Sequence, residues 1–169
     1  MVHSGYEKAK SVQIDIYFDG SCKNVKGESS PMGLGVAVFA EGEFIEEYSK
    51  SIFRWERGER CSNNVSEWMA CVEAMKIAYA IRTKIPEAKI RVYSDSQLIT
   101  RQYNGEYTVS DNFRSYYQEA RKYGLLAYVR MISWIPREQN KMADKLAGEG
   151  RRKDVERFEQ FQQSQKQKV

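Results

Sequence analysis

The chain has 169 residues, of which 41% are hydrophobic and 30% are charged, and its formal net charge is +4. These values are typical of one globular domain, which at this size buries roughly 70% of the surface of its unfolded chain. No apolar run reaches the about 20 residues that cross a bilayer, and residues 1–11 lack the apolar stretch of a secretion signal, so we expect a cytoplasmic protein without membrane association.

The first third of the chain predicts three antiparallel strands. Residues 12–18 (VQIDIYF) place apolar side chains at every second position, which is the period of a half-buried strand. Residues 34–40 (LGVAVFA) form a nearly continuous β-prone run, and residues 43–53 alternate loosely after the short Glu41-Gly42 turn. Together the three segments indicate a meander.

Helices and strands alternate in the rest of the chain. From residue 64 the apolar period changes to three and four residues, which predicts a helix over 64–81. A strand over 89–94 follows, and Asp95-Ser96 stands where the N-cap of the next helix is expected. The later predicted elements are a short helix over 97–102, a helix over 111–123, a strand over 126–134 and a helix from about 138 into the 150s.

This order of elements predicts an α/β fold. The last two strands each follow a helical connection, so they should run parallel to one another beside the meander. The result is a five-stranded mixed sheet, three antiparallel strands and then two parallel ones, flanked by helices on both faces. We assign residues 12–150 to the domain, residues 1–11 to a flexible N-terminal tail, and residues 151–169 to a helix extension and a polar, basic C-terminal tail. The last residues (FQQSQKQKV) lack an apolar face and are expected to be frayed or disordered.

The cysteines give no indication of a disulfide framework. Cys22, Cys61 and Cys71 are odd in number and lack the C-x-x-C spacing of a structural zinc site. We expect reduced thiols in the core or at the surface, as is usual in a reducing compartment.

Four acidic residues stand where the predicted fold could bring them together. Asp19 ends the first strand and Asp95 ends the fourth, and ligands of open α/β sheets gather at such carboxyl ends. Glu67 is expected in the first turn of the helix over 64–81, on a face of small and apolar residues. Asp144 lies in the last helix, seven residues after Arg137.

Each of these residues also has an ordinary structural explanation. An aspartate before glycine forms turns, and an aspartate before serine caps helices. Glu67 would stabilise a helix N-terminus, and Asp144 would form a surface pair with Arg137. For any one of the four alone, the structural role is the better explanation.

If all four carboxylates converge, their mutual repulsion requires cations. Oxygen ligands suit Mg²⁺ or Mn²⁺, which bind through a few carboxylates, water and substrate phosphate. A pair of such ions performs in-line phosphoryl displacement. The implied enzyme is a metal-dependent phosphodiesterase.

Five segments, in order and approximate spacing, resemble the motifs of type 1 ribonuclease H, and the resemblance covers about residues 11–150. Any one segment is weak evidence, but five in the right order are strong. The segments are DGSCKN (19–24), GLGVAV (33–38), SNNVSEWMA (62–70), YSDSQ (93–97) and WIPREQNKMADKLA (134–147).

The resemblance implies a ribonuclease H-like fold whose acidic quartet binds two Mg²⁺ ions, with Mn²⁺ as a substitute. The residues that match the quartet are Asp19, Glu67, Asp95 and Asp144. Members of the family cut the RNA strand of RNA/DNA hybrids and leave 5′-phosphate and 3′-hydroxyl ends. By the same matching, Asn63, Asn64 and Gln97 would contact the hybrid in its minor groove, where 2′-hydroxyls mark the RNA strand. Asn24 and Ser62 would hold a phosphate of the DNA strand, although turn and cap roles explain each of them equally well.

Two departures from many bacterial relatives place the chain nearer the archaeal-like branch of the family. The only histidine is His3, so no histidine precedes the last acidic residue, and Arg137 stands at the matching place. A guanidinium stays charged near neutrality, so Arg137 would position phosphate and not transfer protons.

The Lys/Arg/Trp-rich insertion that grips the DNA strand in several relatives is also missing. The alternative basic candidates are Arg54, Arg57 and Arg60 around Trp55, and Arg151, Arg152 and Lys153, for each of which a solvated surface is the competing explanation.

The expected function is therefore hydrolysis of the RNA strand of RNA/DNA hybrids by a monomer. One alternative is a catalytically silent nucleic-acid-binding module, which the presence of all four carboxylates disfavours. Another is a nuclease of the same fold that acts on double-stranded RNA or DNA junctions. Exonucleases of the superfamily carry Asp-x-Glu on the first strand, whereas Asp19 is followed by Gly20 and Ser21.

Overall fold

The computed structural model describes residues 10–23, 31–52, 62–153 and 155–168. Its core is a five-stranded mixed sheet with the strand order β3-β2-β1-β4-β5, which confirms the predicted fold class. The strands are β1 (Gln13–Cys22), β2 (Met32–Ala40), β3 (Glu43–Ile52), β4 (Lys89–Ser94) and β5 (Ser133–Trp134). The helices are α2 (Asn63–Lys84), α3 (Gln97–Tyr103), η1 (Asp111–Phe113), α4 (Arg114–Leu126), η2 (Arg137–Gln139), α5 (Lys141–Arg152) and α6 (Val155–Lys166).

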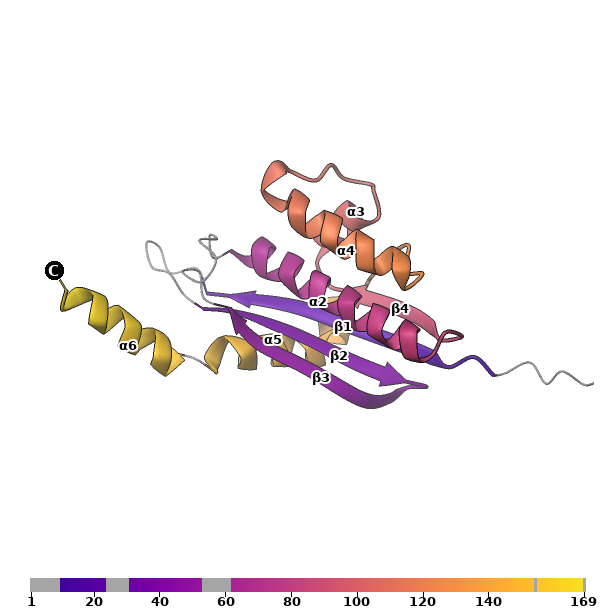
Figure 1. Ribbon diagram of the computed structural model, residues 1–169, viewed down its shortest axis with the longest axis horizontal. Coiled ribbons are helices and arrows are strands. Elements are labelled where there is room, and N and C mark those ends of the chain that lie inside the picture. The colour runs from indigo at the N-terminus through magenta and orange to yellow at the C-terminus, as the bar shows by residue number, and fades with distance from the viewer. Residues whose placement is uncertain (1–9, 24–30, 53–61, 154, 169) are drawn as a thin grey trace, which may run out of the picture.

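Helices cover both faces of the sheet (Figure 1). Strands β1, β2 and β3 are antiparallel neighbours, while β4 pairs parallel with both β1 and β5. Helix α2 packs on β1 and β2 with α4 outside it, and α5 packs on the opposite face against β1, β2 and β3. The central strand β1 thus has a helix on each side.

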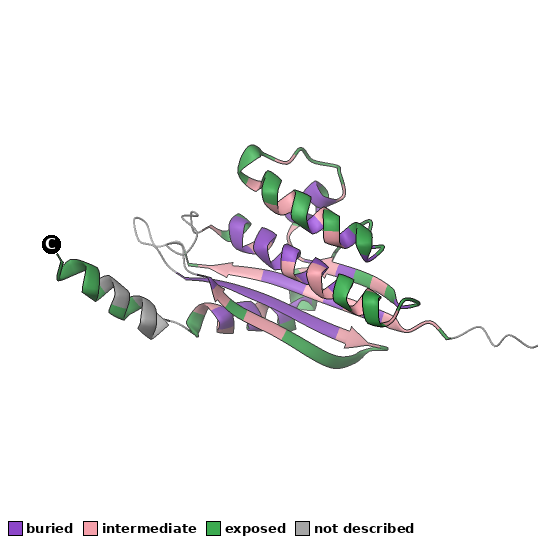
Figure 2. Ribbon diagram, viewed as in Figure 1, coloured by how far each residue is buried: buried purple, intermediate pink, exposed green. Residues whose placement is uncertain are grey.

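The alternation predicted for the first strand decides what each face buries. Ile14, Ile16 and Phe18 are fully buried in the core with α2, because side chains two residues apart in a strand share a face. Buried residues concentrate along β1, β2 and the inner side of α2 (Figure 2). Asp19 has the opposite parity to Phe18, so it lies on the α5 side of the sheet. It does not end the strand as predicted, because Gly20, Ser21 and Cys22 continue the pairing with β2.

The fifth strand is much shorter than predicted. Helix α4 continues to Leu126, and Tyr128 then adopts a left-handed backbone conformation with φ of 59°. Ahead of β5, the side chain of Asn104 replaces a strand partner: its Nδ2 donates to the Ile132 carbonyl at 2.9 Å, and its Oδ1 accepts from the Ile132 amide at 2.8 Å. A side-chain amide therefore satisfies backbone groups for which the sequence predicted strand pairing.

Two further predictions are wrong. The C-terminal segment is helical to Lys166, where the sequence suggested a frayed or disordered end from residue 161. Cys22 is disulfide-bonded, where reduced cysteines were expected, whereas Cys71 is free and fully buried in α2. Within the described ranges, no helix is both long and apolar enough to cross a membrane.

Candidate active site

Gly20 allows the end of β1 to touch the beginning of α2. A Cβ at this position would lie 2.3 Å from the Ser66 carbonyl carbon and 2.4 Å from the Glu67 amide nitrogen, so no other residue fits without moving the helix. The contact places Glu67 beside Asp19. Glu67 is the fifth residue of α2 and thus lies in its second turn, not in the first turn as predicted.

Gly35 does the same for α5 on the other face of the sheet. It pairs with Asp19 in the ladder between β1 and β2, and a Cβ on it would lie 2.3 Å from the Ala143 carbonyl oxygen. The close packing brings the first turn of α5, which carries Asp144, to the end of β1. Two glycines thus bring two helices to one strand end.

The fourth carboxylate comes from the neighbouring parallel strand. Asp95 directly follows β4, and the Ser96 side chain caps α3 by accepting from the Ile99 amide at 3.3 Å. Because Ser96 is the cap, the Asp95 side chain remains available. An open cleft of about 410 Å³ results, and it contains the whole predicted quartet. Its lining residues are Asp19, Gly20, Ser21, Cys22, Asn63, Glu67, Asp95, Arg137 and Asp144.

The electrostatics of the cleft show uncompensated negative charge. The pKa of Asp19 is raised to about 8, first because the side chain is buried and then because the other three carboxylates of the quartet lie nearby. Burial also raises the pKa of Glu67, against a hydrogen bond with the Ser96 side chain that lowers it. The metal-free site therefore retains a proton near neutral pH.

The pKa of Asp95 is subject to several opposing influences. Burial raises its pKa, while the Asn140 amide and the Arg137 guanidinium lower it. Its backbone carbonyl accepts a hydrogen bond of 3.0 Å from Trp134 Nε1. Asp95, at the end of β4, thus interacts with two parts of the chain. Arg137 of η2 and Asn140 before α5 act on its carboxylate, and Trp134 of β5 donates to its backbone carbonyl.

Arg137 lies at the mouth of the cleft. Its Nη2 is 3.3 Å from Asp144 Oδ1, and the two side chains are 78% and 45% exposed. An ion pair so open to water adds little stability. The sequence suggested this pair as an ordinary surface contact, and the structure shows the pair at the opening of the acidic cleft.

Asn140 is a site residue that was not singled out from the sequence. It is 1% exposed and donates from Nδ2 to the Phe18 carbonyl at 3.0 Å, while its backbone carbonyl accepts from the backbone amide of Asp144 at 3.0 Å. It therefore connects β1 to α5 and also lies beside Asp95. The available signal was an amide side chain in front of the last helix, which is also an ordinary N-cap pattern.

The predicted substrate-binding residues are only partly brought together. Asn63 lines the acidic cleft, and Asn64 is exposed on the first turn of α2 but is not among the lining residues. Gln97 is exposed and lines a neighbouring pocket. Ser62 is the N-cap of α2 and accepts from the Val65 amide at 3.1 Å, so its structural role is observed. Asn24 lies outside the described residues.

Of the two predicted groups of basic residues, the structure describes only one. Arg54, Trp55, Arg57 and Arg60 lie outside the described residues. Arg151 and Arg152 end α5, and Lys153 Nζ donates to the Ser49 carbonyl of β3 at 2.9 Å. Arg151 and Arg152 are thus on the same helix as Asp144, at its other end, and Lys153 is the C-cap of this helix.

The donor set of the cleft suits a hydrated divalent cation. In the described part of the chain, no three Asp, Glu, His or Cys side chains are already close enough to enclose a metal ion. Mg²⁺ does not require such a cage, because it keeps several waters and binds proteins through one or two carboxylates. Four clustered carboxylates, one with a strongly raised pKa, are the environment that such a cation would neutralise.

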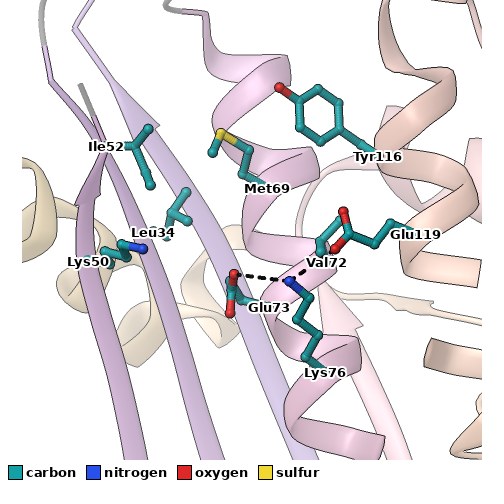
Figure 3. Close-up of a pocket in the computed structure, with 9 residues that line it drawn as sticks. All are labelled: Leu34, Lys50, Ile52, Met69, Val72, Glu73, Lys76, Tyr116 and Glu119. Atoms are coloured by element: carbon teal, nitrogen blue, oxygen red, sulfur yellow. Dashed lines mark ion pairs between the residues drawn. The ribbon is translucent and has the colours of Figure 1, made fainter. Parts of the chain in front are cut away.

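A separate pocket of about 180 Å³ lies between the sheet and helices α2 and α4, and it shares no residue with the acidic cleft (Figure 3). Lys76 crosses it, with Nζ 3.0 Å from Glu119 Oε1 and 3.9 Å from Glu73 Oε1. Lys50 lines the pocket as well, so its two lysines balance its two glutamates, in contrast to the excess of carboxylates in the cleft.

Comparison with known proteins gives a matching family and a similar protein. The sequence model of the reverse transcriptase-like family matches residues 17–150. The Enterococcus faecalis protein EbsB, whose name describes it as a hydrolase, is 26% identical over 132 residues, which are 78% of this chain and 89% of that protein.

Solved structures resemble the chain over most of its length. LC11-RNase H1, isolated from compost by a metagenomic approach, is 29% identical, with a TM-score of 0.71 over 85% of this chain and 98% of that chain. The same protein in complex with an RNA/DNA hybrid gives a TM-score of 0.69 over 84% and 99%. RNase H1 from the halophilic archaeon Halobacterium salinarum is 26% identical, with a TM-score of 0.62 over 82% and 96%.

Proposed function

Since the chain belongs to the reverse transcriptase-like family and has the fold of type 1 ribonuclease H, we propose that it is a metal-dependent endonuclease that hydrolyses the RNA strand of RNA/DNA hybrids. The products would be 5′-phosphate and 3′-hydroxyl ends. One observation carries the proposal: carboxylates from β1, α2, the end of β4 and α5 converge in one open cleft. Four separated segments have no structural need to place like charges together.

The quartet would hold the cations. Asp19 lies near the carboxyl end of β1 and Asp95 directly follows the neighbouring parallel strand β4, while Glu67 and Asp144 approach from opposite faces of the sheet. Two Mg²⁺ ions, when bound, would neutralise the phosphate and lower the pKa of a water nucleophile. The open cleft leaves room for substrate phosphate and metal-bound water.

The remaining site residues would orient the substrate. Arg137, exposed at the mouth of the cleft, would hold the scissile phosphate or the product phosphate through charge and hydrogen bonds. Asn63, Asn64 and Gln97 would contact the minor groove of the hybrid, because an amide both donates to and accepts from a 2′-hydroxyl. Asn24 and Ser62 would contact the DNA strand.

The proposal is tested by incubating the protein in Mg²⁺ with four labelled substrates: an RNA/DNA hybrid, double-stranded RNA, double-stranded DNA and a four-way DNA junction. We expect cleavage of the RNA strand of the hybrid, with internal cuts that leave 5′-phosphates. Cleavage of the junction alone would identify a resolvase of the same fold. Tight binding of the hybrid without cleavage would identify a silent binding module.

A further inference from the structure

A pocket of about 400 Å³ lies between α3 and the segment that ends in β5, and no residue lines both this pocket and the acidic cleft. Two links connect it to Asp95. Gln97, which lines the pocket, follows Asp95 by two residues, and Trp134, which lines it as well, donates from Nε1 to the Asp95 carbonyl at 3.0 Å. Any group that occupies the pocket would therefore lie next to whatever occupies the cleft.

The pocket contains a fixed aromatic surface. Trp134 is 47% exposed, whereas a tryptophan in a folded protein is usually more deeply buried. Its hydrogen bond to the Asp95 carbonyl holds the indole ring in one orientation. Ile132, which is 2% exposed, supplies a buried apolar floor. The combination offers a flat, apolar surface to a planar ligand.

Polar groups with defined positions surround this surface. Thr100 is 5% exposed, and its buried hydroxyl has no hydrogen-bond partner among the described residues. Arg101 is held by Tyr107, whose hydroxyl accepts from its Nη1 at 2.8 Å and whose ring lies 5.1 Å from its guanidinium carbon, and its Nε lies 4.0 Å from Oε2 of Glu106, which also lines the pocket. Gln97 contributes an exposed amide. An aromatic platform with an amide and a guanidinium at its edge is the chemistry that recognises a nucleobase.

We propose that this pocket binds one unpaired nucleobase of the strand that is cut, at the nucleotide next to the scissile phosphate. The inference rests on the proposed function, because it takes the scissile phosphate to lie in the acidic cleft. A base inside a continuous duplex is stacked on both faces and cannot cover the indole. The occupant is therefore a base that has left the stack, at a single-nucleotide bulge, a frayed end or an overhang.

The test compares two RNA/DNA hybrids of equal length, one fully paired and one with a single unpaired 2-aminopurine ribonucleotide in the RNA strand. Binding is measured with the full chain carrying Asp19→Asn, which should not cleave, and the bulge is moved along the strand in steps of one nucleotide. At one position we expect quenching of the 2-aminopurine fluorescence and about tenfold tighter binding than for the paired hybrid. Equal affinity at every position, without quenching, would overturn the inference.

Variants of the pocket supply the matched controls. We define the preference as the affinity for the bulged hybrid divided by the affinity for the paired hybrid. Trp134→Leu should remove the quenching and reduce this preference to about one, whereas Trp134→Phe, which keeps a ring, should retain part of it. Gln97→Met should lower the preference while the Trp134 hydrogen bond to Asp95 remains, and because the preference is a ratio of two affinities, any lost minor-groove contact affects both hybrids alike. Tyr128→Leu, at an aromatic residue 73% exposed and outside the pocket, should change neither value.

Preference and quenching that persist in Trp134→Leu would place the base elsewhere and overturn the inference. Failure of the proposed function gives a different result, because the wild-type chain would then leave both hybrids uncut in Mg²⁺.

Discussion

Gly35 stands opposite Asp19 in the ladder between β1 and β2, and a Cβ on Gly35 would lie 2.3 Å from the Ala143 carbonyl oxygen. Because the clash is with backbone, Gly35→Ala must push α5 away from the strand and move Asp144 from Asp19. We expect a lower melting temperature and a loss of hybrid cleavage of at least about tenfold. Thermal unfolding and steady-state rates measure the two effects.

Gly148→Ala in the same helix is the matched control. A Cβ there would meet only the flexible end of Arg152, at 3.3 Å, and alanine favours a helix by roughly 0.5–1 kcal/mol over glycine. This variant should be at least as stable as the wild type and fully active. If Gly35→Ala behaved in the same way, the close packing of α5 would not be what positions Asp144.

Asn140→Ala should affect both stability and catalysis. Loss of the Nδ2 donor leaves the buried Phe18 carbonyl without its side-chain partner, at a cost of about 1–3 kcal/mol in the free energy of unfolding. The same change removes the amide beside Asp95, so kcat should fall by a larger factor than the factor by which Km changes. Urea unfolding and kcat measurements check this, and an unchanged kcat would limit Asn140 to a structural role.

Arg137→Ala should separate catalysis from stability. The Arg137–Asp144 pair is exposed, so its loss should change the free energy of unfolding by less than about 1 kcal/mol. We expect turnover to fall by an order of magnitude or more, and Arg137→Lys to recover part of it because the positive charge remains. Wild-type steady-state rates in Arg137→Ala would remove this residue from the mechanism.

The raised pKa of Asp19 predicts how the stability of the metal-free protein depends on pH. In the unfolded chain an aspartate has a pKa near 3.8, and in the folded protein the pKa of Asp19 is about 8. The contribution of this group is therefore fully present below about pH 4 and is lost as pH rises through about 8. In EDTA, the melting temperature of the wild type should decrease over this range more steeply than that of Asp19→Asn.

Added Mg²⁺ competes with the same proton, so its binding should strengthen as pH rises through about 8. Calorimetric titration at several pH values measures this directly. Parallel melting curves for wild type and Asp19→Asn, or Mg²⁺ affinity independent of pH, would contradict the electrostatic account of the cleft.

Local patterns were sufficient to predict most of the fold. Alternation located β1, in which Ile14, Ile16 and Phe18 are buried as the pattern predicted. The short β5 could not be predicted, because the pairing of Ile132 with the Asn104 side chain is a contact across 28 residues. The disulfide of Cys22 likewise depends on tertiary geometry, which cysteine spacing does not report.

The candidate site was predictable to the extent that its residues follow element ends. Asp95 and Asp144 were placed correctly by strand and helix boundaries. Asp19 lies three residues before the end of β1 and not at its end as predicted, and Glu67 is the fifth residue of α2 because this helix begins one residue earlier than predicted. What the sequence could not show is how closely the helices approach. That depends on Gly20 and Gly35, which look like ordinary turn and strand glycines until the backbone contacts of Ser66 and Ala143 are known.

The central claim, that the acidic cleft is a metal-dependent catalytic site for RNA/DNA hybrids, is tested most directly with Asp95→Asn. This change keeps the size of the side chain and the backbone carbonyl that binds Trp134, but it removes one charge of the quartet. In Mg²⁺, the wild type should cut the RNA strand of the hybrid, and Asp95→Asn should bind the hybrid with similar affinity but cut it at least about a thousandfold more slowly. Equal cleavage by the two proteins would contradict the account.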